Sequence, residues 1–184
     1  MHVLPLGYRA YLDGKPNVTL QDPLSGERRG FTVTTEYFEL LIAIDPTVSI
    51  PKEDARLRQL SDLGIVALLP DDVTLEELIF VPVLRSEIIS QEVLDTGYYR
   101  FGFGNNKSFT VGIFGSRFLQ LLDSQRTLGE IIQVVKDEDL AGEEEFAYHK
   151  QQSKAYEQSL IAEAYFLAKA LIDSGAATFE VKPS

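Results

Sequence analysis

The chain has 184 residues, a length that fits one ordinary domain or two small ones packed together. Hydrophobic residues make up 45% of it and aromatic residues 10%, which is enough to build a buried core and argues against extensive disorder. The 28 acidic residues outnumber the 17 basic ones and give a net charge of −11, so nucleic acid is a poor default partner and a cationic partner fits better.

The chain contains no cysteine, which excludes disulfides, thiolate metal sites and a cysteine nucleophile. Its N-terminus lacks the basic start and apolar run of a signal peptide. No apolar stretch approaches the roughly 20 residues that span a bilayer. These features predict a soluble, cytoplasmic protein with no membrane association.

The first half of the chain predicts short strands followed by helices. Strands are expected at residues 8–12, 18–20 and 31–34, because turn-forming residues separate these apolar stretches. Apolar residues then recur at helical spacing over 37–44, and a second helix is expected from Pro51 to Gly64. An apolar strand at 65–69 follows that glycine.

Residues 70–97 are expected to form a connector. Thr74 and Glu77 have the spacing of a capping box, so a short helix is predicted to start there. Pro82 argues against a continuous helix through this segment.

The second half is predicted to open with a hairpin of two alternating strands, 99–103 and 109–113. A loop with an odd number of residues puts all the large apolar side chains on one face of the hairpin. We expect Phe103 opposite Phe109, with Asn or Gly in the left-handed position of the loop.

Three further helices and a strand are expected after the hairpin. One helix covers 116–122, and a second starts at the capping box of 127–130. The acidic segment 137–145 is expected to be a solvated loop. A long helix then ends at Asp173, and a strand follows at 178–181.

The two halves share short patterns in the same order, which suggests an internal duplication. Phe-Thr-Val ends a strand at 31–33 and at 109–111, and a Leu-x-Asp-x-Gly pattern ends a helix at 60–64 and at 171–175. The expected fold is therefore α+β, with two winged-helix-like units that each combine a small antiparallel sheet with three helices. The expected boundaries are 1–69 for the first unit, 70–97 for the connector and 98–184 for the second unit.

Two runs in the second half resemble the PqqD-like domains, which recognise peptides for enzymes that modify ribosomally made peptides. These runs are 114–132 (FGSRFLQLLDSQRTLGEII) and 166–175 (FLAKALIDSG), within a resemblance that covers about 99–181. Ser124 stands where the family usually has Gly, and Gly129 lies inside the expected second helix.

The resemblance implies a non-catalytic module that binds the leader of a precursor peptide for a modifying enzyme. In that family the peptide adds as a strand to the sheet edge and lies against the third helix. The residues implied on the edge strand and on the long helix are Phe109, Thr110, Val111, Ile113, Ile161, Tyr165, Lys169 and Ile172. An alternative for the apolar stripe on that helix is packing against the first half of the protein.

No catalytic, metal or cofactor site is predicted. His149 lies four residues after Glu145, but metal sites need more ligands than this pair, and a solvated surface pair is the better explanation. The acidic segment has the wrong spacing for a calcium loop.

Two alternative functions stay open. One is a winged-helix DNA-binding regulator with a basic face that includes Arg117, Arg126, Lys154 and Lys169. The other is an accessory subunit or fragment of a larger enzyme. The sequence does not predict the oligomeric state.

Overall fold

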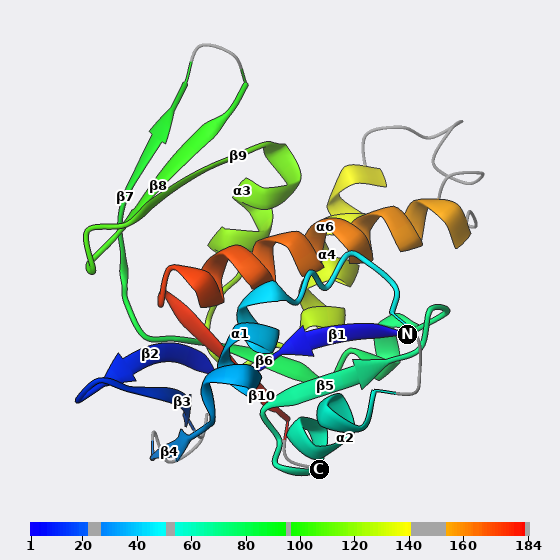
Figure 1. Cartoon of the computed structure of the whole chain (residues 1–184). Helices are drawn as coiled ribbons and strands as arrows, with labels where there is room; N and C mark the ends of the chain where they lie inside the picture. The colour runs from blue at the N-terminus through cyan, green and yellow to red at the C-terminus, as the bar shows by residue number, and fades with distance from the viewer. Residues whose placement is uncertain (22–26, 51–53, 95–96, 141–153, 183–184) are drawn as a thin grey trace.

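The computed structural model describes residues 1–21, 27–50, 54–94, 97–140 and 154–182. These residues form a mixed α+β fold with several small antiparallel sheets (Figure 1). Among the described helices, none is both long and apolar enough to cross a membrane.

The first unit contains a three-stranded sheet, a two-stranded sheet and two helices. The order of the three-stranded sheet is β2-β3-β4, and β1 pairs antiparallel with β5. The elements are β1 (His2–Pro5), β2 (Tyr8–Leu12), β3 (Lys15–Gln21), β4 (Arg28–Thr32), α1 (Thr35–Ala43), α2 (Ala55–Asp62) and β5 (Val66–Leu69).

The described residues of the second unit repeat this arrangement and add a helix. Its three-stranded sheet has the order β7-β8-β9, and β6 pairs antiparallel with β10. The 3₁₀ helix η1 (Leu75–Glu77) precedes β6 (Phe80–Leu84), β7 (Ile88–Val93), β8 (Tyr99–Phe103), β9 (Ser108–Val111), α3 (Ile113–Gln120), α4 (Leu128–Leu140), α6 (Lys154–Asp173) and β10 (Ala177–Val181).

In each unit the first strand pairs with the last strand, and the three-stranded sheet and helices lie between them in sequence. Corresponding backbone hydrogen bonds follow these pairs. The Leu6 N–H donates to the Ile65 carbonyl at 3.0 Å, and the Arg85 N–H donates to the Ala176 carbonyl at 2.8 Å. The shared order noted in the sequence is thus matched by a shared topology.

The helix that precedes the last strand ends in the same way in both units. Gly64 and Gly175 have φ of 70° and 73°, a left-handed conformation that favours glycine. The next residue in each case donates a 2.9 Å hydrogen bond back to the carbonyl of Leu60 or Leu171. This is the Schellman type of helix end, and it explains why the Leu-x-Asp-x-Gly pattern occurs twice.

The expected domain boundaries are wrong in one respect, because residues 70–97 are more than a connector. They supply β6 and β7, so the second unit begins near residue 80. Pro82 concealed β6, since proline is rare in strands. Pro82 lies opposite Phe179 in the pairing of β6 with β10. The Phe179 N–H donates to the Leu6 carbonyl at 2.7 Å and so points away from β6, which means that these two opposite residues are not hydrogen-bonded to each other. The missing N–H of Pro82 therefore costs no hydrogen bond between β6 and β10.

Two other expectations about helices also differ from the structure. The first unit has two helices in its described residues, and the segment around 47–49, where a degraded or very short middle helix was expected, contains a turn. The start of the expected acidic loop is helical, because α4 continues to Leu140. The remainder of that loop lies within 141–153, outside the described residues.

The β8–β9 hairpin has the expected odd loop and shared apolar face, but its register differs by two residues. Phe101 pairs with Phe109, and the loop contains three residues. Asn106 occupies the left-handed position with φ of 62°, as expected. Phe101 and Phe103 are almost completely buried. Because the loop has an odd number of residues, their side chains lie on the same face of the sheet as those of Phe109 and Val111, and this face meets the core.

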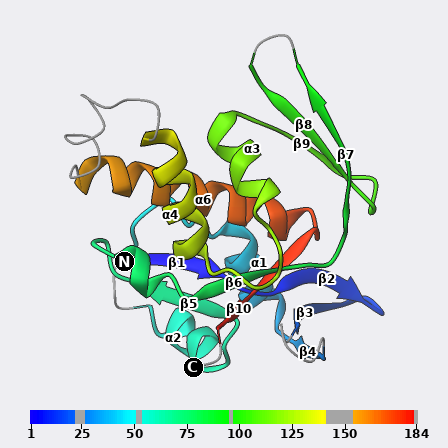
Figure 2. The same cartoon turned by 180° about the vertical axis from the view of Figure 1, so that it is seen from behind.

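Helix α6 lies between the two units, and it contacts β1 and β2 of the first unit as well as α3, α4 and β10 of the second (Figures 1 and 2). The larger core is built mainly by the second unit but includes Leu4, Leu6 and Leu20. A smaller core fills the first unit around Leu41 and Leu60. The units therefore share buried surface.

Candidate functional site

The outer edge of β9 is unpaired among the described strands, because β9 is the last strand in the order β7-β8-β9. The Phe103 N–H donates to the Lys107 carbonyl at 2.9 Å, which sets the alternation of hydrogen bonds along the hairpin. By that alternation the backbone groups of Ser108 and Thr110 point away from β8. Both residues are exposed, so an extended chain has access to these groups.

Strand β9 runs alongside α6. At one end, the Asn105 side-chain amide donates to the Ser174 carbonyl at 3.0 Å, which ties the β8–β9 turn to the C-terminal end of α6. At the other end, Ile113 shares a pocket with Leu160 and Glu163 of α6. Figure 1 shows β9 passing from this turn to the start of α3 above α6. The free edge of β9 is therefore next to the α6 surface.

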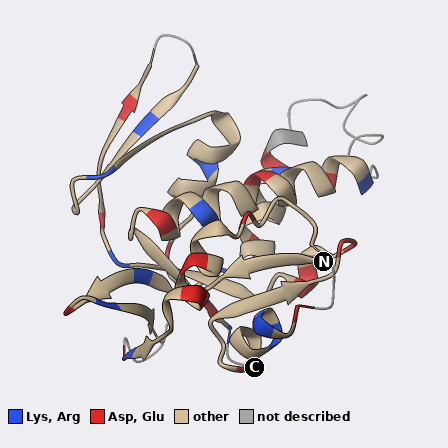
Figure 3. Ribbon diagram, viewed as in Figure 1, with Lys and Arg blue, Asp and Glu red and all other residues tan. Residues whose placement is uncertain are grey.

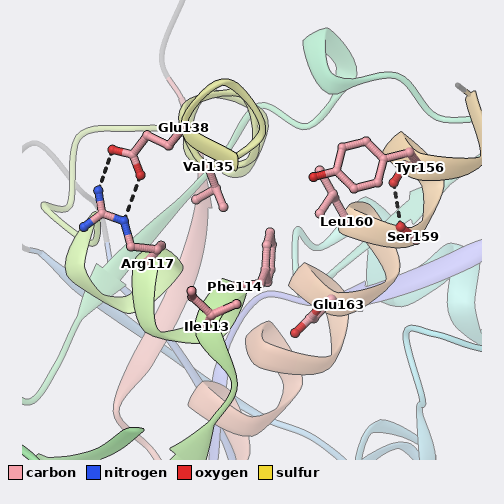
Figure 4. Close-up of a pocket in the computed structure, with 9 residues that line it drawn as sticks. All are labelled: Ile113, Phe114, Arg117, Val135, Glu138, Tyr156, Ser159, Leu160 and Glu163. Atoms are coloured by element: carbon pink, nitrogen blue, oxygen red, sulfur yellow. Dashed lines mark hydrogen bonds and ion pairs between the residues drawn. The ribbon is translucent and has the colours of Figure 1, made fainter. Parts of the chain in front are cut away.

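A pocket of about 480 Å³ opens at the α3 end of β9 (Figure 4). It lies between α3, α4 and α6, and its walls combine apolar and charged side chains. The lining residues are Ile113, Phe114, Arg117, Val135, Glu138, Tyr156, Ser159, Leu160 and Glu163.

Two of the three charged side chains in this pocket neutralise each other. Arg117 donates from Nε and Nη2 to the two carboxylate oxygens of Glu138, at 2.8 and 2.5 Å. These hydrogen bonds raise the pKa of Arg117. Glu163 has no hydrogen-bond or ion-pair partner among the described residues, and partial burial of its carboxyl group raises its pKa although the side chain as a whole is exposed.

The four implied residues of the edge strand divide between core and surface. Val111 is 8% exposed and belongs to the core, and the partly buried Phe109 packs against the core residue Phe103 with ring centroids 5.2 Å apart. Thr110 is exposed, and Ile113 is 69% exposed at the mouth of the pocket. The accessible parts of this region are thus the outer backbone of β9 and Ile113 at the start of α3.

The implied residues on α6 lie on a different face from the β9 edge. Ile161, Tyr165 and Ile172 are only 2%, 2% and 1% exposed, and the Tyr165 ring lies 5.6 Å from the His2 ring of the first unit. Lys169 forms an ion pair with Asp173 beside the same unit. This apolar stripe packs against the first half of the protein, and none of its three buried residues contacts solvent enough to hold a peptide.

The sequence reasoning missed two exposed residues of α6, of which Glu163 lines the pocket that also contains Ile113. Glu163 and Phe166 are separated by three positions and so lie on neighbouring parts of one helix face. Phe166 is 63% exposed, although phenylalanine is among the residue types most often buried. The available signal was that Phe166 belongs to neither buried stripe of the helix.

The basic face required by the DNA-binding alternative is largely neutralised. Arg117 pairs with Glu138, Arg126 pairs with Asp123 at 3.2 Å, and Lys169 pairs with Asp173. Lys154 is exposed. Figure 3 shows Lys and Arg distributed over several elements and mixed with Asp and Glu. The Glu145–His149 pair lies outside the described residues.

Comparison of the chain with protein-family models, with curated proteins and with solved structures finds no match. The resemblance to the PqqD-like domains therefore stays a prediction from the sequence.

Proposed function

We propose that this protein is a non-catalytic module that binds a peptide as an added strand on the outer edge of β9. The observation that carries the proposal is the accessible backbone of Ser108 and Thr110 next to the α6 surface. In strand addition, backbone hydrogen bonds supply part of the affinity and side-chain pockets supply specificity. The proposed peptide is the leader of a precursor that a separate enzyme modifies in the cytoplasm.

An exposed apolar side chain at one end of the edge supports this proposal. Ile113 stands at the α3 end of β9 and is 69% exposed. A strand on β9 would cover part of this side chain, and burying an apolar side chain contributes roughly 1.5–3 kcal/mol when burial is complete. The pocket between α3, α4 and α6 would receive a side chain of the same peptide.

Replacement of Thr110 by proline tests the edge directly. The Thr110 N–H points away from β8, so Thr110→Pro removes a donor for the peptide without removing a hydrogen bond of the hairpin. The matched control is Thr32→Pro, because Thr32 has the same position in β4 of the first unit. The residue pair next to it is joined by a backbone hydrogen bond, so by the same alternation the Thr32 N–H also points away from the neighbouring strand.

We suggest selecting binders from a displayed library of random peptides and measuring their affinity by fluorescence anisotropy. Thr110→Pro is expected to weaken binding about tenfold or more, and Thr32→Pro is expected to leave it unchanged. In an NMR titration, amide shifts should move at residues 108–113 and on the outer face of α6. Equal affinities for both variants and the unchanged protein, or no selected binders, would contradict the proposal.

A further inference from the structure

We propose that the pocket between α3, α4 and α6 selects a basic side chain, Lys or Arg, of the peptide that adds to β9. This inference rests on the proposed function, and it adds the chemical class of the residue that the peptide must carry.

The walls of the pocket suit the hydrocarbon stem of a long side chain. Phe114, Val135 and Leu160 come from three different helices and give the pocket an apolar interior. Figure 4 shows Phe114 between the Arg117–Glu138 pair and Glu163. Lys and Arg side chains place their methylene groups along such surfaces while the charged end reaches a polar group.

The charge of the pocket favours a cation. Arg117 is already held by both oxygens of Glu138, so it has little remaining attraction for an anionic ligand. Glu163 is the carboxylate that lacks a partner among the described residues that line the pocket. Among the described residues that line the pocket, one negative charge is therefore left uncompensated, on a protein whose net charge is −11.

The position of the pocket links it to strand addition. Ile113 belongs to the pocket and follows β9 by only two residues. A peptide paired with Ser108 and Thr110 that continues in the same direction reaches the pocket within a few residues, since a strand advances about 3.3 Å per residue. Its charged end group would then lie next to Glu163.

Two small probes with the same apolar tail test the charge preference without any peptide. We suggest titrating the protein with hexylammonium and with hexan-1-ol, and following the amide and methyl shifts of the pocket residues by NMR. Hexylammonium is expected to bind about fivefold more tightly than hexan-1-ol, a ratio typical of a single partly screened ion pair. Its affinity should fall as Glu163 is protonated at acidic pH.

Glu163→Gln keeps the size of the side chain and removes its charge, so it is expected to make the two affinities equal and to abolish the pH dependence. Glu39→Gln is the matched control, since Glu39 is exposed on α1 outside the pocket, and it should preserve the fivefold ratio. Equal affinities in the unchanged protein, or an unchanged ratio in Glu163→Gln, would overturn the inference.

The peptide library separates this inference from the proposed function. If the inference holds, selected peptides are enriched in Lys or Arg at one position, and the enrichment disappears when Glu163→Gln is the bait. Selected peptides that lose affinity on Thr110→Pro but show no basic preference would overturn the inference and leave strand addition supported.

Discussion

Gly129 shows how one side chain, or its absence, sets the distance between two elements. It lies at the start of α4, and a Cβ atom at this position would come within 1.9 Å of the Leu75 carbonyl oxygen in η1. The Gly129 N–H also donates to the Leu78 carbonyl at 3.1 Å. Only glycine allows α4 to approach η1 this closely.

We expect Gly129→Ala to destabilise the protein by about 2 kcal/mol. Alanine is a better helix former than glycine by up to about 1 kcal/mol, but overpacking typically costs about 1–3 kcal/mol, and a backbone oxygen cannot rotate away. The urea midpoint of unfolding checks the sign. Gly104→Ala is the control, because the atoms nearest to its new Cβ would be 3.9 Å away; a stabilised Gly129→Ala would show that the close contact is relieved without cost.

At the scale of single elements, the start of α4 is fixed by the capping box that the sequence predicts. The Thr127 N–H donates to a Glu130 oxygen at 2.7 Å, and the Glu130 N–H donates to the Thr127 hydroxyl at 3.1 Å. Lys182 donates to the other Glu130 oxygen at 2.7 Å. These hydrogen bonds, that of Lys182 foremost, lower the pKa of Glu130.

Glu130 is therefore expected to stabilise the protein at neutral pH and to lose this effect in acid. Because its pKa is lower in the folded state than in the unfolded state, the stabilisation is present above the unfolded pKa and disappears as the pH falls through the folded pKa. We expect Glu130→Gln to cost about 0.5–1 kcal/mol near neutral pH, a modest value since the side chain is half exposed.

Urea unfolding at several pH values tests this prediction, and the difference between Glu130→Gln and the unchanged protein should close at acidic pH. Glu76→Gln is the control, since Glu76 is exposed and the capping hydrogen bonds at η1 involve Glu77 instead. A difference that stays constant with pH would mean that the charge of Glu130 plays no part in stabilising α4.

At the scale of the whole molecule, a buried arginine joins the two units. Arg9 of β2 forms an ion pair with Asp173 at the end of α6 and donates to the Leu41 carbonyl of α1. Its side chain is 5% exposed, and burial lowers its pKa to about 10. Among the described residues, the counter-charge of this guanidinium group comes from Asp173 of the second unit.

Asp173→Asn is expected to destabilise the protein by about 1–2 kcal/mol, because it leaves the buried Arg9 without its carboxylate. The control is Glu92→Gln, which removes the carboxylate of the exposed Arg100–Glu92 pair and should change stability by less than about 0.5 kcal/mol. Chemical denaturation followed by both tyrosine fluorescence and circular dichroism should give one shared transition for each protein. Equal stabilities for the two variants would show that the Arg9–Asp173 contact does not couple the units.

The sequence by itself determined the features that depend on neighbouring residues. It gave the capping box at Thr127, the glycine ends at Gly64 and Gly175, and the face of the hairpin that carries Phe101, because the hydrogen bonds and side-chain alternation involved span only a few positions. Periodicity also showed that Ile161 lies on an apolar stripe of α6.

Only the tertiary structure decided what covers each face. An apolar stripe indicates that a surface is buried but not which partner buries it, so the choice between a peptide groove and the first unit at Tyr165 needed the contact with His2. The pairing of β6 with β10 joins segments far apart in the chain, and no local pattern specifies such a partner. The pocket beside Glu163 likewise exists only where three helices from separate segments meet.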